Sequence, residues 1–503
     1  MSAAAPSARR RYDRAIFLLL DGARADVFHD LLAKGDLPNV ARTLAEPGGA
    51  TTATTVFPSV TGVAYAPYIT GCFPQRTNLT GVRWLDRELY SKRKVSMSRF
   101  RNYAGPGHFM MDRDMSRDVS TLFELLKPSQ NIFGTISRGT GKLRNAYLVR
   151  RVPMVLNFVM TGDWTPIDQR TGALLLRQSM RKRPHRFTFH TTLQVDEHSH
   201  MDGPFSPRVR EGYRAFDRTV GQLSARLRAR GHLERTLIAM GADHGHSPVS
   251  NHFDLEGFFE RRGLRTLYYG KQVKRWFGCD AAVMVGGNAI AHVYLKGQGW
   301  MSGESGVERL AKHPGLIEDL LAEPGVDILA WNGENGVVHV RSRRGSADVR
   351  LDGEHVTYAP RGGDPFGYPE LPARMTRHEA IQLTQHTTYP DAIVQVAQIF
   401  GASRSGDLIV TSALSWDLRS RGDHHLHRSG HGSLHRDHMA VPFAMNHPFD
   451  TDAVRSVDAF PTILGLMGEP VPGDIDGRDL TFPDLPDAWG EPDVEAPAAA
   501  QRS

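Results

Sequence analysis

Three hydrophobic segments of the chain each end at a polar residue, and we interpret them as buried strands. These segments and the aspartates that follow them are residues 15–20 with Asp21, residues 186–195 with Asp196, and residues 235–240 with Asp243. The carboxyl ends of the strands in an open parallel sheet face one crevice. The three aspartates are therefore expected to meet at one edge of a sheet.

Between the predicted strands, apolar residues recur at helical spacing, most clearly over residues 207–230. Strands that alternate with helices predict an α/β fold with a mostly parallel central sheet sandwiched by helices. Two regions interrupt this rhythm. Residues 101–185 show weak periodicity, and residues 261–420 contain short strands such as 288–295 and 337–341. We predict that both regions are insertions around the crevice, the second of them a cap.

The same pattern divides the chain into six segments. They are a first core α/β segment over 14–100, an insertion near the crevice over 101–185, a second core segment over 186–260, a cap or insertion over 261–420, a third core segment over 421–485, and a disordered tail over 486–503. The tail is rich in proline, alanine and acidic residues, a composition that buries too little apolar surface to fold.

Composition narrows the classes of partner. The 503 residues carry 61 basic and 55 acidic side chains, a formal charge of +6, and this near balance favours phosphate-bearing small molecules only slightly. Neither a nucleic-acid recognition motif nor an apolar run of about 20 residues, the length of a membrane span, is visible. The two cysteines form no disulfide framework. We therefore expect a soluble, cytoplasmic protein, of an oligomeric state that the sequence does not indicate.

Carboxylates and imidazoles occur in spaced sets that suit divalent metals. A catalytic zinc ion takes three protein ligands of these types and keeps a further position open for substrate. The candidate ligands are Asp21, Asp196 with His200 four residues later, the adjacent pair Asp243 and His244, and His431 in a late Ser-Gly-His-Gly segment. These six residues are enough for two metal sites. Five further histidines between 424 and 438 crowd His431, so a surface histidine cluster is the alternative there.

The order of these motifs resembles that of type I phosphodiesterases and nucleotide pyrophosphatases of the alkaline phosphatase superfamily. Asp-Gly at 21–22, a threonine segment, Asp-x-x-x-His, Asp-His-Gly and a late His-Gly follow one another as in that family, and the similarity covers about 14–100, 186–260 and 421–480. The resemblance implies two bound divalent ions, which we expect to be zinc. Their implied ligands are Asp196, His200 and His431 for one ion, and Asp21, Asp243, His244 and the hydroxyl of Thr61 for the other.

The resemblance also indicates the nucleophile. In the family the attacking threonine stands nine residues before a Thr-Gly pair, and Thr61 stands nine residues before Thr70. Ser59 is the alternative. A threonine hydroxyl is a weak nucleophile at its ordinary pKa, so it needs a metal ion to ionise it. We expect Thr61 to attack phosphorus and to carry the phosphoryl group in a covalent intermediate.

A competing motif begins at Cys72. The segment Cys72-Phe-Pro-Gln-Arg76 is similar to the Cys-x-Pro-x-Arg motif whose cysteine becomes formylglycine in sulfatases. That frame requires a Thr-Gly pair nine residues after Cys72, whereas Thr80 follows at eight. A sulfatase is therefore a less favoured alternative.

One position departs from the family pattern. Nucleotide pyrophosphatases carry an asparagine that helps to hold the phosphoryl oxygens, and the same frame places Val82 at that position. Valine has no hydrogen-bond donor, so the contact has to come from another residue. Arg83 and Asn78 are the candidate substrate-binding residues, and a plain surface arginine is the alternative interpretation of Arg83. The departure weakens the case for a nucleotide substrate.

These features together predict an enzyme that hydrolyses small-molecule phosphate esters, phosphodiesters above all, through a phospho-threonine at a two-metal site. A phosphomonoesterase, phosphonate hydrolase or phosphoethanolamine transferase of the same superfamily is the first alternative. The absence of the family asparagine at Val82 motivates a second alternative, a protein that binds a phosphorylated ligand without turning it over.

Overall fold

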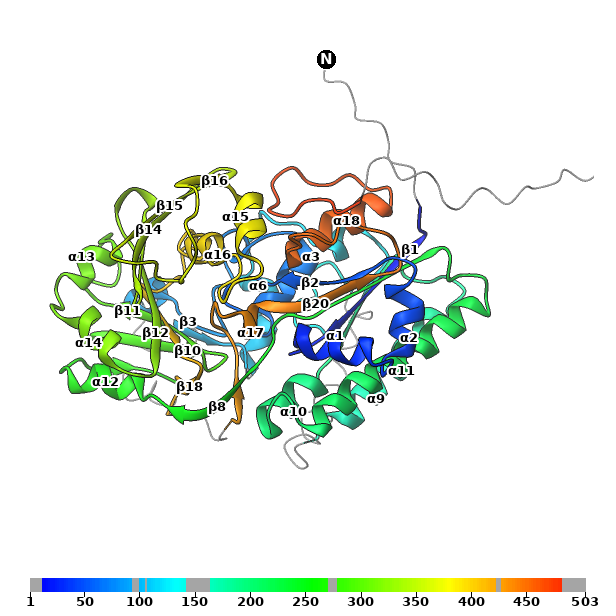
Figure 1. The fold of residues 1–503 in the computed structure, drawn as a ribbon, viewed down its shortest axis with the longest axis horizontal. Helices are drawn as coiled ribbons and strands as arrows, with labels where there is room; N and C mark the ends of the chain where they lie inside the picture. Colours follow the sequence, from blue (N-terminus) through cyan, green and yellow to red (C-terminus); the bar gives the residue numbers. More distant parts are fainter. Residues whose placement is uncertain are drawn as a thin grey trace, which may run out of the picture.

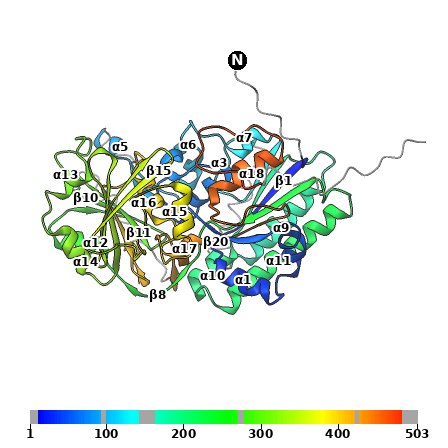
Figure 2. The same ribbon diagram turned by 45° about the horizontal axis from the view of Figure 1, so that its top comes forward.

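Two sheets lie side by side in the molecule, in both views of the ribbon (Figure 1, Figure 2). The computed structural model describes residues 11–92, 99–104, 106–141, 163–269, 278–421 and 427–481. The tail expected over 486–503 lies outside the described residues. Within the described ranges, none of the helices combines the length and the hydropathy needed to cross a bilayer.

The central sheet has six strands, and five of them run in one direction. Their order across the sheet is β2 (Ala50–Thr54), β20 (Ala440–Met445), β7 (Thr236–Gly241), β1 (Arg14–Leu20), β6 (Phe187–Thr192) and β5 (Ser129–Ile132). Only β20 is antiparallel to its neighbours. Every residue of β1 is buried, because helices cover both faces of a parallel sheet. The predicted α/β fold with a mostly parallel sheet is confirmed.

Successive residues of β6 show how the two faces are covered. Phe189 stacks on Phe17 of β1, which packs in turn against Tyr68 of α3 (Ala66–Thr70). The next residue, His190, points to the other face and contacts Thr171 of α9 (Thr165–Ser179). The predicted helix over 207–230 is α11 (Pro207–Arg228), which packs beside α9. Alternation along a strand thus sends neighbouring side chains to different helical layers.

Two expectations about the core differ from the structure. The strand predicted to reach Val195 ends at Thr192, because the carboxylate of Asp168 accepts the amides of Leu193 and Gln194 and so starts helix α10 (Gln194–Asp202). In addition, β5 and α9 belong to the central sheet and its helical layer although both fall inside the predicted insertion over 101–185.

The second sheet lies wholly between residues 266 and 412. Its nine strands follow the order β16 (Arg374–Thr376), β15 (His355–Arg361), β14 (Gly345–Asp352), β13 (Val338–Ser342), β12 (Val326–Asn332), β17 (Leu408–Ser412), β11 (Ile290–Leu295), β10 (Ala281–Gly286) and β9 (Thr266–Leu267). Ala282 and Met284 of β10 join the main core, whereas Val283 and Val285 join a separate core under α12 (Leu255–Arg261) and α14 (Leu316–Ala322). One face of the second sheet therefore packs on the body of the molecule.

Candidate metal centre

The carboxyl ends of β1 and β7 bring one predicted group of ligands together. Asp21 follows β1, and Asp243 and His244 follow β7, which is the neighbouring strand. Nε2 of His244 lies 3.2 Å from Oδ2 of Asp243 and 3.6 Å from Oδ1 of Asp21. All three side chains are fully buried, and their ligand atoms lie within 4.8 Å of one another.

Helix α10 and a late loop supply the second predicted group. Asp196 and His200 stand four residues apart on α10, so both project from the same face. Nε2 of His200 lies 3.5 Å from Oδ1 of Asp196. His431 follows β19 (Ser429–Gly430), which pairs with β8 (Ser247–His252) just after His244 in the chain. These three ligand atoms also lie within 4.8 Å of one another.

The two groups form one continuous centre. Nε2 of His244 lies 3.9 Å from Oδ1 of Asp196, and the rings of His244 and His431 stack with centroids 3.6 Å apart. Gly22 permits this approach, because it has a φ of +72° and a Cβ there would lie 2.6 Å from the Cα of Asp196. All six predicted ligands therefore gather at one edge of the central sheet.

Backbone carbonyls fix the orientation of the three predicted imidazole ligands. The Nδ1 atoms of His244, His200 and His431 donate to the carbonyl oxygens of Gly245, Ser429 and Ser59, at 3.2, 3.0 and 3.0 Å. A carbonyl only accepts, so each Nδ1 carries the proton and each Nε2 keeps a lone pair. This is the arrangement in which a histidine binds a metal ion through Nε2.

The carboxylates of the centre lack the positive charge that their burial requires. Burial, followed by the charge of Asp196, raises the pKa of Asp21 well above its usual range, and burial and Asp21 do the same to Asp243. Oδ1 of Asp21 and Oδ2 of Asp243 are buried and accept no hydrogen bond from the described residues. Burial lowers the pKa of His244 to about 3, so this imidazole is neutral. Divalent cations fit this set of donors and would neutralise it.

Thr61 lies directly at this centre. Its Oγ1 is 3.1 Å from Nε2 of His244. Tyr65, one turn further on, donates a hydrogen bond to Asp21 and so ties the threonine segment to the carboxylates. The alternative nucleophile, Ser59, is fully buried and donates its hydroxyl to the carbonyl of Ser433 at 3.0 Å. The geometry thus favours Thr61 over Ser59.

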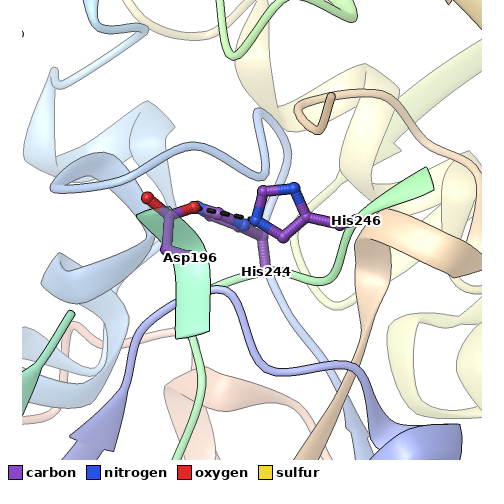
Figure 3. Close-up of side chains that lie close together, drawn as sticks. All are labelled: Asp196, His244 and His246. Atoms are coloured by element: carbon purple, nitrogen blue, oxygen red, sulfur yellow. Dashed lines mark hydrogen bonds and ion pairs between the residues drawn. The ribbon is translucent and has the colours of Figure 1, made fainter. Parts of the chain in front are cut away.

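His246 belongs to the same centre, although no motif in the sequence selected it. Figure 3 shows its ring beside His244, with Nε2 turned to the carboxylate of Asp196. The Nε2 to Oδ1 distance is 2.8 Å, and the Nδ1 atom lies 3.0 Å from the hydroxyl of Ser429. His246 is fully buried and forms a third candidate metal-binding group with Asp196 and His244. Its position two residues after His244 was the available signal.

The two predicted substrate-binding residues make contacts toward the second sheet. The guanidinium of Arg83 lies over the ring of Tyr269 at 4.2 Å, and the amide of Asn78 donates to Ser403 at 3.0 Å. Their role in substrate binding stays a prediction. Val82 and Val60, the residue before Thr61, both pack against the end of β10, because a Cβ on Gly286 would lie 3.8 Å from the Val82 nitrogen and 3.9 Å from Cγ1 of Val60.

Cys72, the residue of the sulfatase alternative, is separated from Thr61 along the chain by the turn at 63–65 and by α3. Burial raises the pKa of its thiol to about 12, and Sγ contacts the carbonyl of Thr70 at 3.3 Å. It is Thr61 that contacts His244. The geometry therefore favours the threonine frame.

Comparisons with known proteins agree with this arrangement. The fold is similar to murine ectonucleotide pyrophosphatase / phosphodiesterase 5, with 12% identity, 93% of this chain and 98% of that chain covered, and a TM-score of 0.55. It is also similar to phosphonoacetate hydrolase from Sinorhizobium meliloti 1021, with 15% identity, coverage of 91% and 96%, and a TM-score of 0.53. No curated protein matches the chain by sequence.

The family itself follows from a match over most of the chain. The family model described as type I phosphodiesterase / nucleotide pyrophosphatase matches residues 15–434. That range holds Thr61 and all six predicted ligands, from Asp21 to His431. The chain therefore belongs to the type I phosphodiesterase/nucleotide pyrophosphatase family.

Proposed function

We propose that this protein hydrolyses phosphate esters, diesters above all, through a covalent intermediate on Thr61. The observation that carries the proposal is the 3.1 Å contact of Thr61 Oγ1 with His244, inside a cluster of three buried carboxylates. Family membership supports metal-dependent hydrolysis of phosphoesters. Among proteins of similar fold, an inactive threonine-to-alanine variant of the murine protein is known in complex with AMP.

The chain's own residues divide into two candidate metal sites. Asp21, Asp243 and His244 with Thr61 would hold one ion, and Asp196, His200 and His431 the other. Two divalent ions at these positions, with zinc best suited to the mixed oxygen and nitrogen donors, would ease ionisation of a hydroxyl and polarise phosphoryl oxygens. His246 would hold Asp196 in place through their 2.8 Å contact.

Thr61 performs the chemical steps in this proposal. Its Oγ1 forms a bond to phosphorus as the bond to the leaving oxygen breaks, and the leaving oxygen takes up a proton in place of the one lost from Thr61. Water then attacks the phospho-threonine, releases the phosphoryl product and restores the hydroxyl. The net reaction consumes one water molecule. Tyr65 holds Asp21 in position for both steps through its hydrogen bond to that carboxylate.

Kinetics with two chromogenic esters tests this proposal. Zinc-loaded protein should hydrolyse bis-p-nitrophenyl phosphate faster than p-nitrophenyl phosphate, and Thr61→Ala should lose at least about 10³-fold in kcat with its metal content unchanged. A preference for the monoester would overturn the diester assignment. Full activity in Thr61→Ala would overturn the mechanism.

A further inference from the structure

Val82 stands where the family pattern has an asparagine that would donate to the phosphoryl group. A transferring phosphoryl group gathers negative charge on its oxygens, and fixed hydrogen-bond donors lower the barrier when they point at those oxygens. The Val82 backbone and the Val60 side chain both pack against Gly286, and valine has no side-chain donor. Arg83 and Asn78 are engaged with Tyr269 and Ser403. A donor from another element would add to these two candidates.

Thr135 offers such a donor beside the nucleophile. It follows β5 and so lies at the same carboxyl edge of the sheet as Asp21 and Asp243. A Cβ on Gly62, the residue after Thr61, would lie 3.3 Å from Oγ1 of Thr135. This oxygen is buried and forms no hydrogen bond with the described residues. Buried hydroxyls usually have a partner, so an unpaired one against the residue that follows the nucleophile points to a ligand contact.

The loop that carries Thr135 is held rigidly. The amide of fully buried Asn131 donates to the carbonyls of Gly134 and Ile136, at 2.8 and 2.9 Å, and accepts from the Gly134 nitrogen at 2.9 Å. These bonds fix the peptides on both sides of Thr135. Phe133 has a φ of 72°, a conformation that is unfavourable for a bulky residue and is often found at functional sites.

A second anchor closes the loop from its other side. The carboxylate of Asp112 accepts the Ser137 amide at 2.7 Å and the Ser137 hydroxyl at 2.6 Å. Asp112 follows Met111, whose Cε would lie 2.9 Å from a Cβ on Gly62. Side chains on both flanks of Thr135 are thus fully hydrogen-bonded, while its own hydroxyl is left facing the segment of Thr61.

We propose that the hydroxyl of Thr135 donates a hydrogen bond to a non-bridging oxygen of the phosphoryl group transferred to Thr61, in the role that Val82 cannot fill. This inference rests on the proposed function. It makes Thr135 a catalytic residue that contacts substrate, and it assigns the contact to the loop after β5, a strand at the edge of the central sheet.

Three variants separate a substrate contact from a structural role. Thr135→Val removes the hydroxyl and keeps the shape, and Thr135→Ser keeps the hydroxyl. Thr140→Val is the matched control, because the Thr140 hydroxyl supports the same loop by donating to the Ser137 carbonyl at 2.7 Å. Each zinc-loaded variant is assayed for kcat and KM with bis-p-nitrophenyl phosphate, for inorganic phosphate affinity by calorimetry, and for zinc content and Tm.

The inference predicts that Thr135→Val loses about 100-fold in kcat/KM, the usual effect of removing one such donor, and binds phosphate more weakly with zinc content unchanged. Thr135→Ser should recover most of the loss, and Thr140→Val should stay near the wild type. Equal effects of Thr135→Val and Thr140→Val would overturn it. If Thr61→Ala kept full turnover, the proposed function would fail, and the phosphate affinity of Thr135→Val would still decide whether Thr135 contacts the anion.

Discussion

The two largest sheets among the described residues differ in how their charged side chains are paired. At the carboxyl edge of the central sheet, Asp21 and Asp243 are fully buried, lie next to each other, and each keep one oxygen without a hydrogen bond from the described residues. In the second sheet, His339 pairs with Asp348 at 2.7 Å. Beside this sheet, buried Arg309 of α13 (Gly306–Leu310) lies 3.5 Å from Asp407, the residue before β17.

This difference indicates where the function lies. Unpaired buried charge is unfavourable to folding, so it persists where a ligand or ion compensates for it. Paired charge needs no such partner. The second sheet reaches the centre through the turn between β10 and β11, where Asn288 bridges to His431. Substitutions at the carboxyl edge of the central sheet should therefore affect activity and metal binding more than substitutions in the second sheet.

The largest effect is expected when a carboxylate at the carboxyl edge of the central sheet is replaced by a neutral amide. Asp243→Asn keeps the shape but removes a charge that would hold a cation, so kcat/KM should fall about 10³-fold or more and one zinc per chain should be lost by elemental analysis. Asp348→Asn in the second sheet is the matched control and should keep both within twofold of wild type. If Asp243→Asn kept two zinc ions per chain, Asp243 would not be a metal ligand and the difference between the two sheets would not reflect metal binding.

Removal of the metal ions should make the stability of the protein depend on pH, through the aspartates at the carboxyl edge of the central sheet. The raised pKa values of Asp21, Asp196 and Asp243 mean that the metal-free fold favours their protonated forms. The contribution of these aspartates to the stability of the metal-free protein is full below their unfolded pKa, near 3.8. It is lost as the pH rises through their pKa values in the folded protein. The Tm difference between zinc-loaded and metal-free protein should therefore widen from pH 5 to pH 8. A constant difference would contradict the charge account.

A smaller effect is expected at His246, which acts on Asp196 through a 2.8 Å contact. His246→Gln should weaken zinc binding about 10- to 100-fold, as is usual when a group that orients a metal ligand is lost. Activity should recover in part at saturating zinc. His339→Gln, at a paired histidine of the second sheet, should leave the zinc affinity unchanged. Equal zinc affinities of His246→Gln and His339→Gln would show that His246 does not support metal binding.

The smallest effect is expected where the second sheet reaches the centre. Asn288 donates to Nδ1 of His427 at 2.6 Å, and the ring of His427 lies 4.4 Å from that of His200. Asn288→Ala removes one hydrogen bond, worth about 1 kcal/mol, so KM should rise a few-fold while kcat and zinc content stay the same. A loss of kcat comparable to that of Asp243→Asn would show that the second sheet takes part in the chemistry.

The sequence predicted what depends on strand ends and motif order. Asp21, Asp196 and Asp243 each follow a hydrophobic strand, so their meeting at one edge could be expected from the sequence. Strand β5 could not be expected in this way, because Ser129–Ile132 is short and partly polar and is buried only by its neighbours. A run of apolar residues can be recognised in the sequence as a buried strand. A partly polar segment gives no such signal, although tertiary packing can bury it as well.

The residues that were missed depend on local backbone geometry. Thr135 is directed at Gly62 by a positive φ at Phe133 and by the amide of Asn131, and neither feature leaves a pattern in the sequence. His246 could have been found, because residues two apart in extended chain lie on the same side and His244 was already a candidate. Arg83 was selected for its charge, but its guanidinium stacks on Tyr269.

The most direct test of the account is to trap the intermediate. Zinc-loaded protein is mixed with bis-p-nitrophenyl phosphate, quenched in acid within the first turnover, and analysed by peptide mass spectrometry. The account predicts a phosphoryl adduct on the peptide that contains Thr61, at the hydroxyl 3.1 Å from His244, and its absence in Thr61→Ala. An adduct on Ser59 or on Cys72, or turnover without any adduct on Thr61, would contradict it.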